Sequence, residues 1–302
     1  MESGAASRTA VFVCQGRAAA DGLIAVGTFA DPVAAQLLSS DELEVVRLAR
    51  SRVAPSQGQQ RFAFESVRAC AEVVAPRTVA VDRVLADAVR PDRRPQVVLL
   101  GAGLDSRPWR LPDLAGATVF AVDHPASQSD ARRRAASLTH PACDLRHVPV
   151  DLAAEALAPA LAAAGHDADR PTVWVWEGVV PYLTTSQVTA TVEAVAAASA
   201  PGSTLALTYQ ERSLTASVGR VLMGLMARVS GAERVLADEP WKSAWTPVGL
   251  EHLLTGRGWI VESDQRLLDV ALAIGSPTRR RRSLRNGRVA VAHRSATAPM
   301  QA

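Results

Sequence analysis

The sequence contains few cysteines and no long apolar run. Its 302 residues include only Cys14, Cys70 and Cys143, whose wide spacing and odd number do not fit a disulfide framework or a zinc site. No run approaches the roughly eighteen apolar residues of a membrane span, and the N-terminus lacks the apolar segment of a secretory signal. We therefore expect a cytoplasmic protein without a membrane partner or a metal site.

Lysine is nearly absent too, since Lys242 is the only one and arginine supplies the other positive charges. The formal net charge of +3 is small, so the composition does not indicate a nucleic-acid partner. The run from Arg279 to Arg282 has no interleaved aromatic residues, which favours a solvated loop. Apolar residues make up 48% of the chain, enough for one large α/β core with or without an appended subdomain.

The chain divides into three predicted parts. Residues 1–10 are small and polar and are expected to be disordered. Residues 11–96 carry apolar residues at helical spacing, so we expect an N-terminal helical cap in which Asp31-Pro32 starts one helix. Residues 97–302 are expected to form a ligand-binding domain built on a sheet.

Apolar strands and helical segments alternate after residue 96. The expected strands lie near 97–101, 118–122, 146–150, 172–176, 203–208, 259–263 and 288–293. The expected helices lie near 126–138, 153–164, 185–200 and 247–256. This alternation predicts βαβ crossovers and a parallel sheet covered on both faces. Residues 212–245 interrupt the rhythm and contain Trp241 and Trp245, so we expect a lid or substrate-side insertion there.

A glycine turn follows the first expected strand. The apolar run 97–100 ends in Gly101-Ala102-Gly103, which is typical of a buried parallel strand that ends at a ligand crevice. A dinucleotide fingerprint needs a third glycine where Ser106 stands, and a P-loop needs a Gly-Lys pair that this chain lacks. The turn therefore predicts a nucleoside site without a pyrophosphate clamp.

Acidic residues follow the next three strands. Asp123, Asp151 and Glu177 each stand where an open α/β sheet binds its ligand. Asp123 lies about twenty residues past the glycines, the usual position of an acid that accepts hydrogen bonds from a ribose diol. Asp123 and Asp151 could each equally be a helix N-cap, but the ordered set favours a shared ligand. A nucleoside without a pyrophosphate indicates S-adenosyl-L-methionine.

Three segments resemble the leucine carboxyl methyltransferase family and its bacterial relatives. They are Gly101-Ala102-Gly103-Leu104-Asp105-Ser106-Arg107, Val122-Asp123-His124-Pro125 and Glu177-Gly178-Val179-Val180-Pro181-Tyr182-Leu183. The resemblance implies S-adenosyl-L-methionine as cofactor. It also implies a doubly wound Rossmann-like methyltransferase fold: seven strands, mostly parallel, the last antiparallel.

The resemblance also implies a role for each candidate cofactor residue. Arg77 would hold the methionine carboxylate and Glu177 the methionine amino group, while Asp123 would bind the ribose. The turn of Gly101, Ala102 and Gly103 would contact the cofactor through its backbone, and Asp151 and Leu152 would lie at the adenine. Arg17 is a weaker candidate for the methionine end.

The expected reaction is methyl transfer to a carboxylate or hydroxyl oxygen of a small molecule. No catalytic base stands out, and Tyr209, Tyr182 and His124 are the candidates. A carboxylate acceptor needs no base, whereas a phenol with a pKa of about 10 would benefit from one. Two alternatives stay open: a protein C-terminal carboxyl methyltransferase, and a non-catalytic protein that binds the cofactor. The sequence predicts neither the acceptor nor the oligomeric state.

Overall fold

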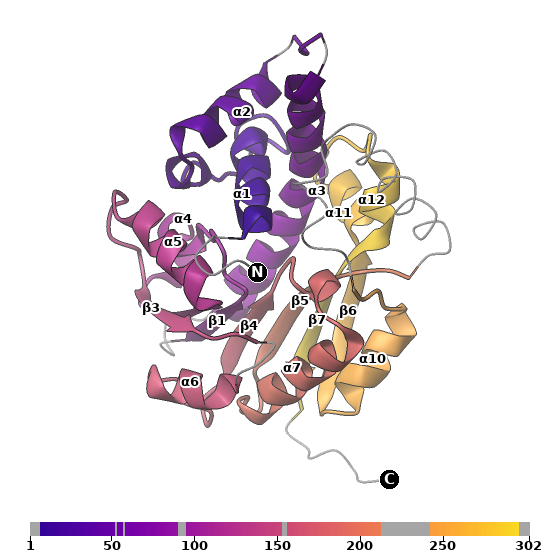
Figure 1. Cartoon of the computed structure of the whole chain (residues 1–302). Helices are drawn as coiled ribbons and strands as arrows, with labels where there is room; N and C mark the ends of the chain where they lie inside the picture. The colour runs from indigo at the N-terminus through magenta and orange to yellow at the C-terminus, as the bar shows by residue number, and fades with distance from the viewer. Residues whose placement is uncertain are drawn as a thin grey trace.

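The computed structural model describes residues 7–51, 53–56, 58–89, 95–152, 156–212 and 242–295. These residues form an open seven-stranded sheet with helices on both faces (Figure 1). The strands are β1 (Gln96–Leu100), β2 (Thr118–Asp123), β3 (Asp144–Pro149), β4 (Thr172–Trp176), β5 (Thr204–Gln210), β6 (Trp259–Arg266) and β7 (Gly287–Arg294). All seven lie where the sequence predicts strands.

The strand order is β3-β2-β1-β4-β5-β7-β6. β1 to β5 pair in parallel, and β7 is antiparallel to both β5 and β6. The predicted doubly wound sheet with an antiparallel last strand is therefore confirmed. β7 is not an edge strand, because it lies between β5 and β6.

Continuous apolar runs place β1 and β4 at the centre of the sheet. Every residue of both strands is buried, as expected for inner parallel strands covered on two faces. One face packs against three helices, and the other face packs mainly against three more. The first three are α6 (Leu157–Ala163), α7 (Thr185–Ala197) and α10 (Pro247–Thr255); the others are α3 (Gly58–Ala88), α11 (Leu267–Ala273) and α12 (Arg281–Asn286). α5 (Pro125–Ala135) follows β2 and contacts β2 and β3.

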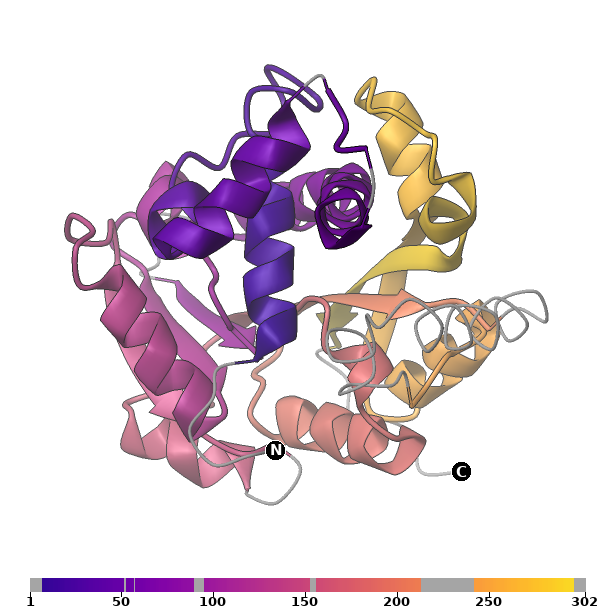
Figure 2. The same cartoon turned by 45° about the horizontal axis from the view of Figure 1, so that its top comes forward.

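The N-terminal helices form a third apolar cluster with part of α3, apart from those on the two faces of the sheet. They are α1 (Arg8–Ala20), the 3₁₀ helix η1 (Ala34–Leu37) and α2 (Ser40–Arg50). Figure 2 shows that the N-terminal end of α1 points toward the sheet. The predicted helix start at Asp31 is a 3₁₀ turn, in which the Asp31 carboxylate accepts a hydrogen bond from the Ala34 amide at 3.0 Å.

Two predicted boundaries are wrong. Residues 8–10 are helical rather than disordered, because the Ser7 hydroxyl accepts a hydrogen bond from the Ala10 amide and caps α1. The helix expected over 153–164 begins only at Leu157. Residues 1–6 and 153–155 lie outside the described part of the chain.

Most of the predicted insertion at 212–245 also lies outside the described residues, Trp241 included. Its described end returns to the sheet, where the Trp245 amide donates to the Gln210 carbonyl at 3.0 Å. The expectation of a substrate-side lid therefore stays a prediction. Among the described helices, none is both long and apolar enough to cross a membrane.

Candidate functional site

The glycine turn joins β1 to the short helix α4 (Arg107–Arg110) at the carboxyl edge of the sheet. Gly101 and Gly103 have φ of +67° and +51°, a region that glycine adopts without the steric cost of a side chain. The amides of Gly101 and Ala102 both donate to the Val122 carbonyl on β2. A Cβ on Gly101 would overlap the Val179 side chain after β4. The turn thus needs glycine both for its conformation and for its close contact with the next loop.

Asp123 ends β2 directly beside this turn. The Gly103 amide donates to its Oδ2 atom at 2.5 Å, and the His124 amide donates to its Oδ1 atom at 2.7 Å. Burial raises the pKa of the Asp123 carboxyl, and the two amide hydrogen bonds oppose that rise. The predicted ribose acid therefore lies against the glycine turn.

Glu177 follows β4 and is clamped by two arginines. Arg77 Nε on α3 lies 2.7 Å from Glu177 Oε1, and Arg107 Nη2 on α4 lies 2.5 Å from Glu177 Oε2. Burial raises the pKa of the Glu177 carboxyl, but Arg107, Arg77 and Arg17 together outweigh it, so the pKa lies well below its usual range. Glu177 is therefore an anion at neutral pH.

Arg77 keeps two nitrogens for another partner. A Cβ on Gly178 would lie 3.5 Å from both Nη1 and Nη2 of Arg77, so the guanidinium lies against the backbone of the loop after β4. Within the described residues these two nitrogens make no hydrogen bond. A planar guanidinium with two adjacent donors fits a carboxylate.

Asp151 and Leu152 follow β3, next to the loop of Asp123. The Val150 amide donates to the Asp123 carbonyl at 2.8 Å, which draws the two loops together. Leu152 packs against the apolar core, and Asp151 is half-buried. The predicted cofactor residues of four strand ends thus lie along one edge of the sheet.

The three candidate bases differ in their surroundings. Tyr209 on β5 is only 1% exposed, and its hydroxyl donates to Asp264 Oδ2 at 2.6 Å. Burial, together with Asp264, raises the pKa of Tyr209, which disfavours the deprotonated form that a base requires. His124 caps α5, where its Nδ1 accepts from the Ala126 amide at 3.2 Å. Tyr182 lies half-buried in the 3₁₀ helix η4 (Val180–Tyr182) and stays a candidate.

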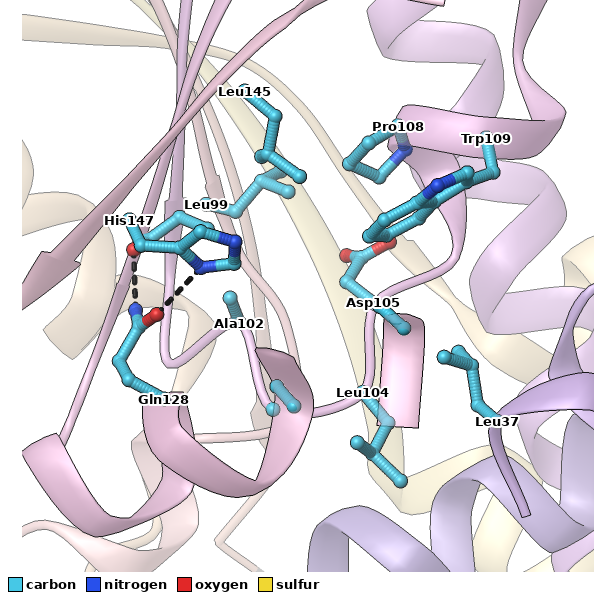
Figure 3. Close-up of a pocket in the computed structure, with 14 residues that line it drawn as sticks. Leu37, Leu99, Ala102, Leu104, Asp105, Pro108, Trp109, Gln128, Leu145 and His147 are labelled. Carbon is cyan, nitrogen blue, oxygen red and sulfur yellow. Dashed lines mark hydrogen bonds between the residues drawn. The ribbon is translucent and has the colours of Figure 1, made fainter. Parts of the chain in front are cut away.

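A small cavity lies beside the glycine turn, between the sheet, α4 and α5 (Figure 3). His147 Nδ1 and Gln128 Oε1 are 2.7 Å apart at its wall. The volume of about 20 Å³ holds about one water molecule and is far too small for a nucleoside. Ala102 and Gly103 of the glycine turn line the cavity, so it adjoins the candidate cofactor site. Among the described residues, no group of three or more histidine, cysteine or acidic side chains could hold a metal ion.

Sequence reasoning missed a buried ion network behind Glu177. It consists of the four arginines Arg17, Arg77, Arg107 and Arg110 and the four acids Asp31, Asp82, Asp105 and Glu177. Several members stand in the segments that carry the family resemblance. Their residue types alone do not reveal which arginine pairs with which carboxylate.

The strand order, the glycine turn and the acids after β2 and β4 define the fold of the Rossmann-like methyltransferases. A solved structure from Thermobifida fusca, described as that of a candidate methyltransferase, is similar with a TM-score of 0.54. The similarity covers 98% of this chain and 97% of that chain at 17% sequence identity, so it bears on the fold alone.

The chain belongs to the leucine carboxyl methyltransferase family, whose family model matches residues 10–196. A relative from Mycolicibacterium gilvum is 39% identical over 57% of this chain, and one from Mycolicibacterium paratuberculosis is 31% identical over 78%. Both are named as candidate S-adenosyl-L-methionine-dependent methyltransferases. The matched regions span 55% and 77% of those two relatives, so the chain covers little more than half of the first.

Proposed function

We propose that this protein transfers a methyl group from S-adenosyl-L-methionine to an oxygen of a small molecule, with a carboxylate as the favoured acceptor. The arrangement of Arg77, Glu177 and Asp123 around the glycine turn carries the proposal. The family and the names of the relatives support the cofactor.

The side chains at the site match the polar groups of this cofactor. Its amino-acid end is a zwitterion, and the site offers the anion Glu177 beside a cation, Arg77, with two nitrogens to spare. Its ribose diol needs a carboxylate, and Asp123 is held in place by two amides. Arg77 would bind the carboxylate, Glu177 the ammonium, Asp123 the ribose, and the loop of Asp151 and Leu152 the adenine.

The bound cofactor supplies a methyl group that is already activated by its positive sulfur. The remaining task of the protein is to bind and orient the two reactants, which contributes roughly 7–11 kcal/mol in well-oriented reactions. The buried, hydrogen-bonded hydroxyl of Tyr209 is a poor base. With one of the three candidate bases disfavoured, we favour an acceptor that needs no deprotonation, and a carboxylate is ionised at neutral pH.

Calorimetric titration with S-adenosyl-L-methionine tests the site. Asp123→Ala removes a charged acceptor of two ribose hydrogen bonds, so the dissociation constant is expected to rise at least about tenfold. Asp113→Ala, an exposed acid in the neighbouring 3₁₀ helix, is the control and is expected to bind as the wild type does. Absence of binding by the wild type, or equal affinity of the two variants, contradicts the proposal.

Methyl-labelled cofactor tests the acceptor class. The protein is incubated with labelled S-adenosyl-L-methionine and a cell extract, which is then separated into macromolecules and small molecules. We expect base-labile label, typical of a methyl ester, in the small-molecule fraction. Label in protein would identify a protein carboxyl methyltransferase, and binding without label in any fraction would indicate a non-catalytic protein.

We also propose a cellular compartment for the protein. We place the protein in the cytoplasm, because Cys14, Cys70 and Cys143 are all free thiols in the structure, as a reducing compartment would keep them.

A further inference from the structure

Arg107 makes three ion pairs with three different carboxylates. It lies on α4 and is only 3% exposed. Its Nε atom lies 2.7 Å from Asp82, its Nη1 atom 2.6 Å from Asp105, and its Nη2 atom 2.5 Å from Glu177. Only the planar fork of an arginine presents donors in three fixed directions, so a lysine could not reproduce these contacts.

The Arg107 contact fixes the orientation of Glu177. Arg77 binds one carboxylate oxygen of Glu177 and Arg107 binds the other. A carboxylate held by one oxygen can still swing about that contact, whereas one held by both oxygens cannot. Since Arg77 is on α3 and Arg107 on α4, the two elements together determine how Glu177 faces the site.

The acids around Arg107 preserve the negative charge of Glu177. Two guanidinium groups beside one carboxylate would give a local excess of positive charge, which repels an ammonium group. Asp82 and Asp105 offset this excess because they pair with Arg107 on its other sides. The whole ion network has four positive and four negative side chains, so it is neutral as a unit.

We propose that Arg107 is a positioning residue for the cofactor: it holds Glu177 in the orientation in which the carboxylate receives the ammonium group of S-adenosyl-L-methionine. Arg107 acts through Glu177 rather than by its own contact with the ligand. The inference rests on the proposed function, because the cofactor contact of Glu177 is part of that proposal.

Binding of two ligands separates positioning from general stability. S-adenosyl-L-methionine has the amino-acid end that Glu177 would bind, and adenosine lacks it. Arg107→Lys keeps the charge and loses the fork, so affinity for S-adenosyl-L-methionine is expected to fall about 10- to 100-fold while affinity for adenosine stays unchanged. Both are measured by calorimetry on proteins whose folding is verified by circular dichroism.

Arg110→Lys is the matched control. The side chain of Arg110 is 6% exposed against 4% for that of Arg107, and it also pairs with Asp82, at 2.7 Å, but it has no ion pair with Glu177 among the described residues. Its ratio of the two affinities is expected to equal that of the wild type. Equal losses in Arg107→Lys and Arg110→Lys, or a wild-type ratio in Arg107→Lys, would overturn the inference. If the wild-type protein binds adenosine but does not bind S-adenosyl-L-methionine, the proposed function itself is refuted.

The pH dependence of binding gives a second readout. In Arg107→Gln, burial raises the pKa of Glu177 and only Arg77 on α3 and Arg17 on α1 still oppose it. As the pH is lowered, affinity for S-adenosyl-L-methionine is therefore expected to begin to fall at a higher pH in Arg107→Gln than in the wild type, because protonated Glu177 cannot pair with an ammonium. Parallel pH profiles of the two proteins would refute this role.

Asp105→Asn is the alternative variant for the same comparison of the two ligands if the Arg107 variants do not fold. It is isosteric and removes one of the acids that offset Arg107. The added local positive charge is expected to lower the affinity for S-adenosyl-L-methionine about tenfold relative to the affinity for adenosine. An unchanged ratio of the two affinities would show that the charge balance around Arg107 has no effect on Glu177, which overturns the inference.

Discussion

Replacing Gly101 with alanine is expected to destabilise the fold by more than the backbone conformation alone requires. Gly101 has φ of +67°, where an alanine costs about 1–2 kcal/mol. The added methyl group would also overlap Cγ2 of Val179. Overpacking of this kind costs about 1–3 kcal/mol, so the total is about 2–5 kcal/mol.

Gly116→Ala separates the two contributions. Gly116 has a similar φ of +76°, and a Cβ there would have nothing within 4 Å. It therefore reports the conformational cost alone, about 1–2 kcal/mol. Urea unfolding of both variants is expected to show that Gly101→Ala loses about 1–3 kcal/mol more than Gly116→Ala.

Val179→Ala completes the test as a double-mutant cycle. Removing the methyl groups of Val179 relieves the overlap, so Gly101→Ala should cost less in the Val179→Ala background than alone. Equal costs of Gly101→Ala and Gly116→Ala, with no coupling to Val179, would refute the reasoning. The contact also has a functional side: Val179 follows Glu177 by two residues, so Gly101→Ala should weaken cofactor binding as well.

Two further predictions concern ionisable groups. Tyr209→Phe is expected to lower the free energy of unfolding by about 1–3 kcal/mol, because the partly buried Asp264 loses a hydrogen bond, and to leave the rate of methyl transfer unchanged. A large loss of rate without loss of stability would instead support Tyr209 as a base. Glu177 has a pKa below its ordinary value of 4.5, so its stabilisation is present above about pH 4.5 and is lost as the pH falls toward the folded pKa. Glu177→Gln should therefore show a smaller loss of unfolding free energy between about pH 5 and about pH 3 than the wild type, and an unchanged slope would contradict that cause.

The strands could be predicted because the residue types within each short run indicate whether that run is buried. The run Thr172–Trp176 is apolar or β-branched throughout, which is typical of an inner strand, and it ends at the charged Glu177. The same logic located the glycine turn and Asp123. Position after a strand was therefore enough to place Asp123, Asp151 and Glu177 at one edge of the sheet, whereas Arg77 on α3 was assigned only through the family resemblance.

The pairing of charges could not be predicted in this way. Arg77 and Glu177 are 100 residues apart in the sequence, and Arg107 and Glu177 are 70 residues apart. Only the packing of α3 and α4 brings them together. Tyr209 shows the same limit, because its partner Asp264 is 55 residues further along the chain and determines that the hydroxyl is buried rather than available to a substrate.

The position of β7 has a consequence for the order in which the protein folds. β5 pairs with β4 on one side and with β7 on the other, and β6 pairs only with β7 among the described strands. During synthesis β6 therefore leaves the ribosome before its partner exists, and β5 keeps an open edge until residues 287–294 have been made. Such open edges are prone to pair with other chains. The last strand therefore completes the sheet by pairing with β5 on one side and by bringing in β6 on the other.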